Sequence, residues 1–220
     1  MALDILSLVI FFAAFGLGVH FFFAQHASAL YFKFMACAVG CYALAELFWF
    51  TFELLNGESQ EGFAITEVAY FGCYLFLLTA NKGQFDSLID DKSPQFKKYR
   101  YLAFIVPVFF STMIFASVLS GSRISTWPLT IISNACYIPM IIASYYNFKH
   151  LIWPNKDYGF IKALRPTNLC LLIAYYADMC CLLFSIKGMT LASQICTIII
   201  AMAMLLAIIF ARRGRQVWLT

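Results

Sequence analysis

Four carboxylates lie inside long apolar stretches of this 220-residue chain, at Glu46, Glu53, Glu67 and Asp178. An ionisable side chain at membrane depth is costly and usually serves a function. Glu53 lies within one turn of the end of its stretch, where it can meet water. At about 1.5 Å per helical residue, Glu46, Glu67 and Asp178 lie about 6 to 14 Å deeper than their stretch ends. These three acids are therefore the principal candidates for a functional site.

Each candidate acid has tyrosine or amide neighbours at helical spacing. Tyr42 precedes Glu46 by four residues, Tyr70 follows Glu67 by three, and Tyr175 precedes Asp178 by three. The alternating direction of the helices places each tyrosine about one turn deeper than its acid or amide. This pattern predicts a pocket at the centre of a helix bundle, opening outward. The expected ligand-binding residues are Glu46, Glu67, Asp178, Tyr42, Trp49, Tyr70, Tyr74, Asn134, Tyr137, Tyr175 and Gln194.

The charge of this pocket indicates what it binds. No Lys or Arg lies well inside an apolar stretch, so the three acids lack an obvious cationic partner. A proton, a metal cation or an amine-bearing ligand suits such a site, and the aromatic faces can contact a cation. The alternative is that the polar groups only pair with one another and hold the helices together.

No catalytic constellation accompanies these residues. The chain has no His-Glu-x-x-His, Gly-x-Ser-x-Gly or phosphate-binding glycine motif. All eight cysteines lie inside the apolar stretches, where close helix packing is their expected role. We therefore expect no catalytic residue, no metal site and no cofactor, and consider an enzyme less favoured than a binding protein.

The composition requires a membrane. Hydrophobic residues make up 63% of the chain and charged residues only 12%, with a mean hydropathy of +0.81. A water-soluble core cannot hide so much apolar surface, which excludes soluble enzymes and nucleic-acid-binding proteins. Stretches of about 18 to 23 apolar residues match the thickness of a bilayer. They predict an all-α bundle of seven transmembrane helices in one domain, residues 1–220, with spans at 5–24, 34–55, 63–80, 101–119, 127–148, 167–186 and 189–211.

The basic residues predict the orientation. All but two of the 15 Lys and Arg residues fall on one side of the predicted spans, and the exceptions are Arg123 and Lys187. The positive-inside rule then places the N-terminus outside and the C-terminus in the cytoplasm. We expect the first stretch to be a retained helix, because it lacks a basic region before it. The loops 81–100 and 149–166 carry most of the cytoplasmic charge and are a possible docking surface for a signalling partner. Pro107 and Pro139 are expected to kink their helices.

Two features of the sequence suggest its ancestry. Tyr42 to Glu46 resembles Tyr175 to Asp178, which hints at a parallel duplication of three helices on each side of a single linking helix. Phe52-Glu53-Leu54, a short polar loop and Tyr70-Phe71-Gly72 resemble the seven-helix sensor region of some bacterial membrane histidine kinases. The resemblance covers residues 44–79 and implies sensing of a small ligand or of the membrane state. The family's output domain does not follow the last span, so a partner protein is expected to signal.

The combined expectation is a receptor-like sensor in a bacterial-type plasma membrane. It would bind a small, cationic or proton-exchanging ligand and signal to a cytoplasmic partner. A proton- or cation-coupled small-molecule transporter using the same carboxylates is the alternative. An intramembrane lipid-modifying enzyme is the third class.

Overall fold

A computed structural model describes residues 2–23, 30–56, 65–86, 90–120, 134–154 and 159–218. Every regular element in these ranges is helical. Five helical segments are long and apolar enough to cross a membrane. They are α1 (Ala2–Phe23), α2 (Leu30–Asn56), the segment Pro94–Leu119, and most of α9 (Gly159–Ile186) and α10 (Thr190–Trp218). The chain is therefore a helical membrane protein.

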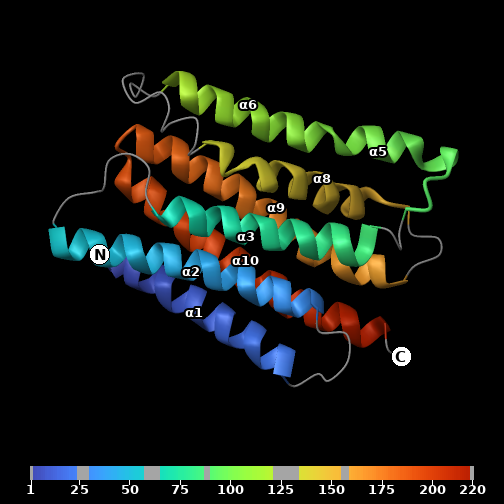
Figure 1. Cartoon of the computed structure of the whole chain (residues 1–220), viewed down its shortest axis with the longest axis horizontal. Coiled ribbons are helices and arrows are strands. Elements are labelled where there is room, and N and C mark those ends of the chain that lie inside the picture. Colours follow the sequence, from blue (N-terminus) through green and yellow to red (C-terminus); the bar gives the residue numbers. More distant parts are fainter. Residues whose placement is uncertain are drawn as a thin grey trace.

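Two shorter helices complete the bundle. They are α3 (Ile65–Asn81) and α8 (Ile138–Ile152), and the segment Pro94–Leu119 includes α5 (Lys97–Ala103) and α6 (Ile105–Ser120). Figure 1 shows the helices lying side by side, with successive passes running in opposite directions. We call the end of the bundle where α1 begins the N-face, and the end where α10 finishes the C-face.

Six of the passes form a closed ring. Helix α1 packs on α2 and α10, α2 on α3, α3 on α8, α8 on α9, and α9 on α10. Helices α5 and α6 lie outside this ring and pack on α8 and α9, as the green helices at the edge of Figure 1 show. This order is the one that a duplication of α1–α3 as α8–α10 predicts, with α5 and α6 as the linking pass. The duplication itself stays a prediction.

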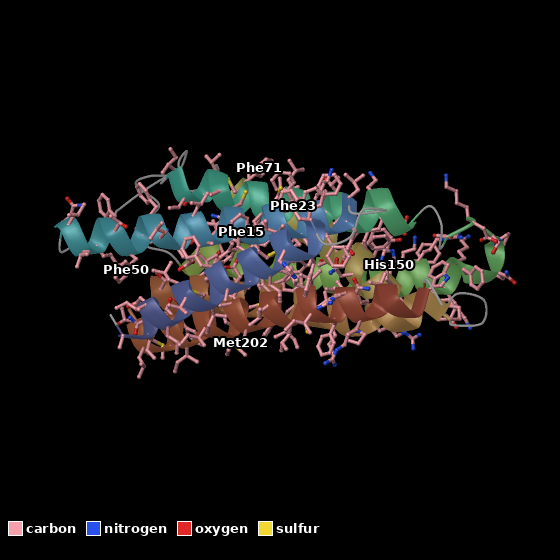
Figure 2. The ribbon with its side chains drawn as sticks, turned by 90° about the horizontal axis from the view of Figure 1, so that it is seen from below. Phe15, Phe23, Phe50, Phe71, His150 and Met202 are labelled. Atoms are coloured by element: carbon pink, nitrogen blue, oxygen red, sulfur yellow. The ribbon has the colours of Figure 1, made fainter. Side chains whose placement is uncertain are left out.

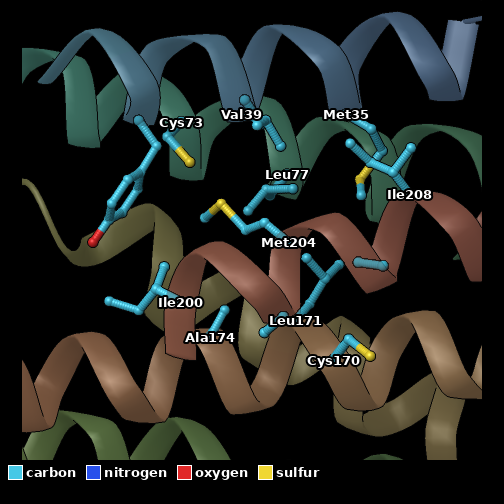
Figure 3. Close-up of a cluster of buried hydrophobic side chains, with 14 of the residues drawn as sticks. Met35, Val39, Cys73, Leu77, Cys170, Leu171, Ala174, Ile200, Met204 and Ile208 are labelled. Atoms are coloured by element: carbon cyan, nitrogen blue, oxygen red, sulfur yellow. The ribbon is translucent and has the colours of Figure 1, made fainter. Parts of the chain in front are cut away.

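Apolar side chains fill the C-face half of the ring. Met35, Leu77, Leu171, Met204 and Ile208 come from four helices and meet in one buried cluster (Figure 3). Buried alanines such as Ala38, Ala174 and Ala207 let the helices approach closely around this cluster.

Large apolar side chains also cover the outside of the bundle. Phe71 on α3 and Met202 on α10 are 37% and 41% exposed and project on opposite sides in Figure 2. A surface of this kind fits a hydrocarbon environment, since contiguous exposed apolar area is rare on soluble monomers.

The helix ends differ from those expected. Helix α9 begins at Gly159 rather than at residue 167, and α8 continues to Ile152, so most of the expected loop 149–166 is helical. Helix α1 begins at Ala2, α2 at Leu30, and α10 continues to Trp218. Apolar runs predict where the hydrocarbon layer ends, whereas backbone hydrogen bonding carries a helix on through polar residues beyond it. The expected loop 81–100 likewise contains short helical turns, at Lys82–Asp86 (η1) and Pro94–Phe96 (η2).

Two prolines lie beside breaks rather than inside kinked helices. Pro107 follows the interruption at Phe104, which separates α5 from α6, and Pro139 lies in the first turn of α8. A proline ring clashes with the carbonyl four residues earlier, so the regular helix ends just before it. Residues 121–133, with the start of the expected span 127–148, lie outside the described residues.

Candidate functional site

Asp178 is the centre of the candidate site. It lies on α9, is 7% exposed, and points across the interior of the ring. The hydroxyl of Tyr42 on α2 donates to its Oδ1 atom at 2.8 Å, and the hydroxyl of Tyr74 on α3 donates to Oδ2. One carboxylate thus joins three helices through both of its oxygens. Because α9 has no extensive backbone contact with α2 or α3, these hydrogen bonds are the polar connection between them.

A second acid lies one turn nearer the N-face. Glu46 follows Tyr42 by four residues on α2, and its Oε1 accepts a hydrogen bond of 2.8 Å from the Tyr70 hydroxyl on α3. The rings of Tyr42 and Tyr70 lie 4.9 Å apart. The two carboxylates therefore share a wall of tyrosines, with Glu46 half-buried and Asp178 buried beneath it.

Aromatic rings surround the lower carboxylate. Phe11 on α1 stacks on Tyr42 at 4.9 Å between centroids. Tyr74 contacts Tyr137 at 6.0 Å and Tyr175 at 5.8 Å. The predicted tyrosine floor is present as ring contacts, but the Tyr175 hydroxyl does not reach Asp178. That hydroxyl is buried and has no hydrogen-bond partner within the described ranges.

The third acid lines a small recess. Glu67, Tyr70, Cys136 and Tyr137 surround about 170 Å³ of space that is partly open to the surroundings. Because part of this space is open to the surroundings, the recess itself has room for about one water molecule. This recess therefore suits a water molecule or an ion of similar size, and Cys136 is a lining residue that the sequence pattern did not indicate.

A further acid lies at the N-face end of α1. The Nε2 atom of Gln194 on α10 donates to Asp4 Oδ2 at 2.9 Å, which joins the first and last helices of the ring. We had expected Gln194 to orient a ligand together with the other amides. Asp4 was missed because an acid in the first turn of a helix usually only caps it.

Trp49 and Asn134 remain at the edge of the site. Trp49 lies on α2, three residues beyond Glu46, and is half-buried. Asn134 precedes Tyr137, and its backbone carbonyl accepts the Tyr137 N–H at 3.1 Å. The structure brings together Asp178, Tyr42 and Tyr74, then Glu46 with Tyr70, and then Glu67 with Tyr137. Among the residues that the structure describes, no hydrogen bond or ring contact joins Trp49 to these groups.

The arrangement has a definite chemical capacity. Hydroxyl groups stabilise the carboxylate of Asp178 without neutralising its charge, so a proton or a small cation can still bind. Within the described part of the chain, no three His, Cys, Asp or Glu side chains lie close enough to hold a metal ion together. Proton exchange is the chemistry that this geometry serves most directly.

A second polar cluster lies at the C-face. We define the C-face ion cluster as Asp86, Asp90, Arg100, Lys149 and His150. The Nζ of Lys149 is 2.6 Å from Asp86 Oδ1 and 2.7 Å from Asp90 Oδ2, and Arg100 donates to both oxygens of Asp90. His150 lies 3.4 Å from Asp86, near the position labelled in Figure 2. The cluster ties the end of α3 to α5 and α8.

The ion cluster holds its aspartates in the charged form. Burial by itself raises the pKa of Asp86, but hydrogen bonds from His150 and Lys149 outweigh it and keep that pKa below its ordinary value. Burial also opposes the charge of Asp90, whose pKa is nevertheless well below its usual range because Arg100 and Lys149 donate to it. Sequence reasoning placed these residues in solvated loops and missed the cluster. The only trace of it in the sequence is the helical spacing of Lys149 from Tyr145, Tyr146 and Trp153, whose rings its ammonium group contacts in the structure.

Comparisons with protein-family models, with curated proteins and with solved structures find no match to this chain. The class of protein therefore follows from the fold and the site alone: a helical membrane protein with a tyrosine-bound carboxylate inside its ring.

Proposed function

We propose that this protein is a membrane sensor module that responds to protons, or to a small cation, reaching Asp178 from the N-face. The observation that carries this proposal is the pair of tyrosine hydroxyls, from α2 and α3, on the buried carboxylate of α9. The basic residues favour an N-face that is outside and a C-face that is cytoplasmic, as in a seven-span plasma-membrane protein.

Protonation of Asp178 would change how three helices are connected. The carboxylate accepts two hydrogen bonds, one from Tyr42 and one from Tyr74. A carboxylic acid carries a proton on one oxygen and donates there, so the tyrosine hydroxyl at that oxygen turns its own hydrogen away and accepts instead of donating. The network thus has two bonding states, and a ligand that favours one of them shifts the bundle toward it.

The size of the recess favours a very small ligand. The space beside Glu67 and Tyr70 holds about 170 Å³, and it lies on the same tyrosine wall as Glu46. Glu67, Glu46 and Asp178 come from three helices and run from partly exposed to buried. Such a series supports stepwise entry of a proton or a small ammonium ion.

The C-face ion cluster supports a route by which the state of Asp178 reaches a cytoplasmic partner. It joins the end of α3, which carries Tyr74, to α8, which packs on α9. A shift of α3 relative to α9 would therefore reach the Asp86–Lys149 pair at the opposite end. We infer that a cytoplasmic partner reads the position of this cluster and of the adjoining segments 81–100 and 149–166.

The first test measures protonation of Asp178 directly. Infrared difference spectra of the purified protein in lipid nanodiscs, taken on acidification, should show a carboxylic-acid carbonyl band. Asp178→Asn should remove that band, whereas Glu53→Gln, which changes an exposed acid on α2, should leave it. A spectrum without an Asp178-dependent band, in a protein that keeps its helical content, would reject the proposal. Methylammonium added at constant pH tests whether a small cation is the ligand. Its binding should likewise depend on Asp178.

A proton- or cation-coupled transporter is the second candidate. Buried polar side chains continue from Asp178 toward the C-face, at Tyr175, Asn147 and Asn168, and this observation favours transport. Proton flux into liposomes containing only this protein separates the two functions. Sustained flux that Asp178→Asn abolishes would indicate a transporter, whereas proton uptake at Asp178 without sustained flux would indicate a sensor.

A further inference from the structure

Several buried polar atoms have no hydrogen-bond partner within the described ranges. Both side-chain atoms of Asn147 on α8 are in this state, and the residue is 0% exposed. On α9 the same holds for Thr167 Oγ1, Asn168 Oδ1 and Tyr175 Oη. Burying a polar group without a partner destabilises a protein, so several such groups on two adjacent helices need an explanation.

The helix register places these groups in order along the bundle. Arg165 on α9 donates to the Trp153 carbonyl at 2.8 Å, which places the start of α9 beside the end of the antiparallel α8. Counting about 1.5 Å per residue from there, Asn168 lies about 5 Å nearer the N-face, Asn147 about 9 Å, and Tyr175 about 15 Å. Asp178 follows about one turn above Tyr175.

The ion cluster occupies the other end of this series. His150 on α8 is at the level of Asn168, and it approaches Asp86 at 3.4 Å. Helix α3 supplies Asn81, which is buried at about the level of Asn147, and then the Asp86 turn. Titratable and charged groups that face the series include Asp178, Tyr74 and Tyr175 near its middle, Cys73 and Tyr31 beside Tyr175, and Asp86, Asp90, Lys149, His150 and Arg165 at the C-face end.

Water is the ligand that these groups can bind. Successive levels lie about 4 to 6 Å apart along the axis, which is the span that one water molecule bridges with two hydrogen bonds. Internal waters typically satisfy buried amides and hydroxyls that lack protein partners. The apolar cluster of Met35, Leu77 and Met204 fills the ring centre, so the polar series lies beside it, where α3, α8 and α9 meet.

We propose that a file of bound water molecules at the junction of α3, α8 and α9 carries protons between Asp178 and the C-face ion cluster. A proton leaves the Asp178 carboxyl, is passed along the waters at the levels of Tyr175, Asn147 and Asn168, and reaches His150 or Asp86. Each transfer breaks one O–H bond and forms another, and the waters and side-chain amides end chemically unchanged. The inference rests on the proposed function, since it takes Asp178 as the proton-binding residue. A route from Asp178 to the C-face is also what the transporter candidate requires, so sustained flux that Thr167→Val slows would favour the transporter over the sensor.

Radiolytic hydroxyl labelling tests the bound water directly. Hydroxyl radicals produced from water inside the full-length protein in nanodiscs modify the side chains beside that water. We expect modification of Tyr175, although it is 0% exposed, and none of Met35, which is equally buried but lies in the apolar cluster. Methionine is the more reactive side chain, so this contrast reports local water. Labelling of Tyr175 at no more than the level of Met35 would overturn the proposal.

Two variants test the route itself. Asn147→Leu and the nearly isosteric Thr167→Val should each lower the labelling of Tyr175 and slow proton exchange between Asp178 and the C-face. Ser117→Ala is the matched control, because this buried hydroxyl on α6 bonds only to the Ile114 carbonyl of its own helix. Exchange that is unchanged in Thr167→Val and Asn147→Leu would overturn the route.

The test separates this inference from the proposed function. A missing Asp178-dependent carboxyl band rejects the proton-binding role but leaves the Tyr175 labelling as it is. A missing Tyr175 label with an intact carboxyl band rejects the water file and keeps the sensor.

Discussion

The molecule stabilises buried carboxylates in two ways. Asp178 is held by neutral hydroxyl donors, whereas Asp86 and Asp90 are held by Lys149, Arg100 and His150. Ion pairs lower the energy of the charged form strongly and so lock it. Hydroxyl donors leave the acid free to change its protonation state. This difference separates the candidate sensing residue from the structural ion pairs at the C-face.

The tyrosine donors on Asp178 make a first testable prediction. Removing the hydroxyl in Tyr74→Phe leaves one carboxylate oxygen without its donor, and we expect the free energy of unfolding to fall by about 1–3 kcal/mol. Tyr42→Phe should have a similar effect, and the double variant should lose less than the sum, because both act on one acid. Denaturation in mixed micelles measures these changes.

Tyr101→Phe is the control for this series, since Tyr101 is 62% exposed on α5. Its unfolding free energy should match that of the wild type. Equal stability of the wild type and Tyr74→Phe would contradict the described hydrogen bond.

Individual residues of the site could be predicted because placing an acid in an apolar segment costs free energy, so such acids are rare there. Asp178 and Glu46 were therefore visible from composition, and helical spacing then indicated Tyr42 and Tyr70. Asp4 and the ion cluster were not visible, because acids and lysines near helix ends are common and normally solvated. Which of them is buried depends on which helix end packs nearby, and spacing along one helix does not contain that information.

At the scale of single helices, α1 offers a matched pair of glycines. A Cβ at Gly18 would lie 3.2 Å from Ala36 Cβ and 3.4 Å from Ala36 Cα on α2, whereas one at Gly16 would meet nothing within 4 Å. We expect Gly16→Ala to be neutral or to stabilise by up to about 1 kcal/mol through helix propensity. Gly18→Val should cost about 1–3 kcal/mol because it forces α1 away from α2.

The measurement is again the free energy of unfolding in mixed micelles. Gly18→Ala should fall between the two variants, since its single methyl group needs a shift of only a few tenths of an ångström. A Gly18→Val protein as stable as Gly16→Ala would show that α1 and α2 do not pack at this position.

The connection between η1, α5 and α8 makes a prediction about pH. The pKa values of Asp86 and Asp90 are lowered in the folded protein, so these acids stabilise it at neutral pH. The contribution is lost as the pH falls below about 4, where the unfolded carboxyls take up protons first. Unfolding curves at a series of pH values should show this loss, and Asp90→Asn should reduce it. Glu53→Gln should keep the wild-type pH dependence, and an unchanged dependence in Asp90→Asn would contradict the role of the cluster.

Helix ends illustrate the limit of sequence reasoning at this scale. The apolar runs located the helices, five of which are long and apolar enough to cross a membrane, but they placed the start of α9 eight residues too late and treated Pro139 as a kink. Hydropathy reports the solvent around a residue and not the backbone hydrogen bond that it makes. The break at Phe104 follows from the ring of Pro107, a local clash that a window average cannot register.

At the scale of the whole molecule, the orientation is open to a direct experiment. Lys187 lies exposed after α9 at the N-face, and Lys98 lies exposed on α5 at the C-face. We expect a membrane-impermeant thiol reagent to label Lys187→Cys in intact cells and Lys98→Cys only after lysis, as the positive-inside rule requires. The reverse pattern would place the N-face in the cytoplasm.

The native cysteines do not obscure this labelling. All eight lie within the apolar stretches, so a charged reagent does not reach them readily. The wild-type protein provides the background signal, and both variants should label after lysis.

The closed ring could not be predicted from the sequence, although the helices that form it could. Ring order depends on which helices meet across the bundle, as α1 meets α10 through Asp4 and Gln194. Small residues and aromatic rings at complementary heights determine these contacts, and hydropathy alone does not distinguish one neighbour from another.

The position of α5 and α6 outside the ring has a consequence for variation. Most of this pass faces away from the other helices, with Val108, Phe115 and Leu119 each more than 60% exposed. Such positions need only to dissolve in lipid, so one apolar side chain can replace another at little cost. The inward positions of α9, which carry the carboxyl of Asp178, the phenol of Tyr175 and the amide of Asn168, tolerate few replacements. The sequence should therefore change rapidly along α5 and α6 and slowly along α9, although both segments are apolar enough to cross a membrane.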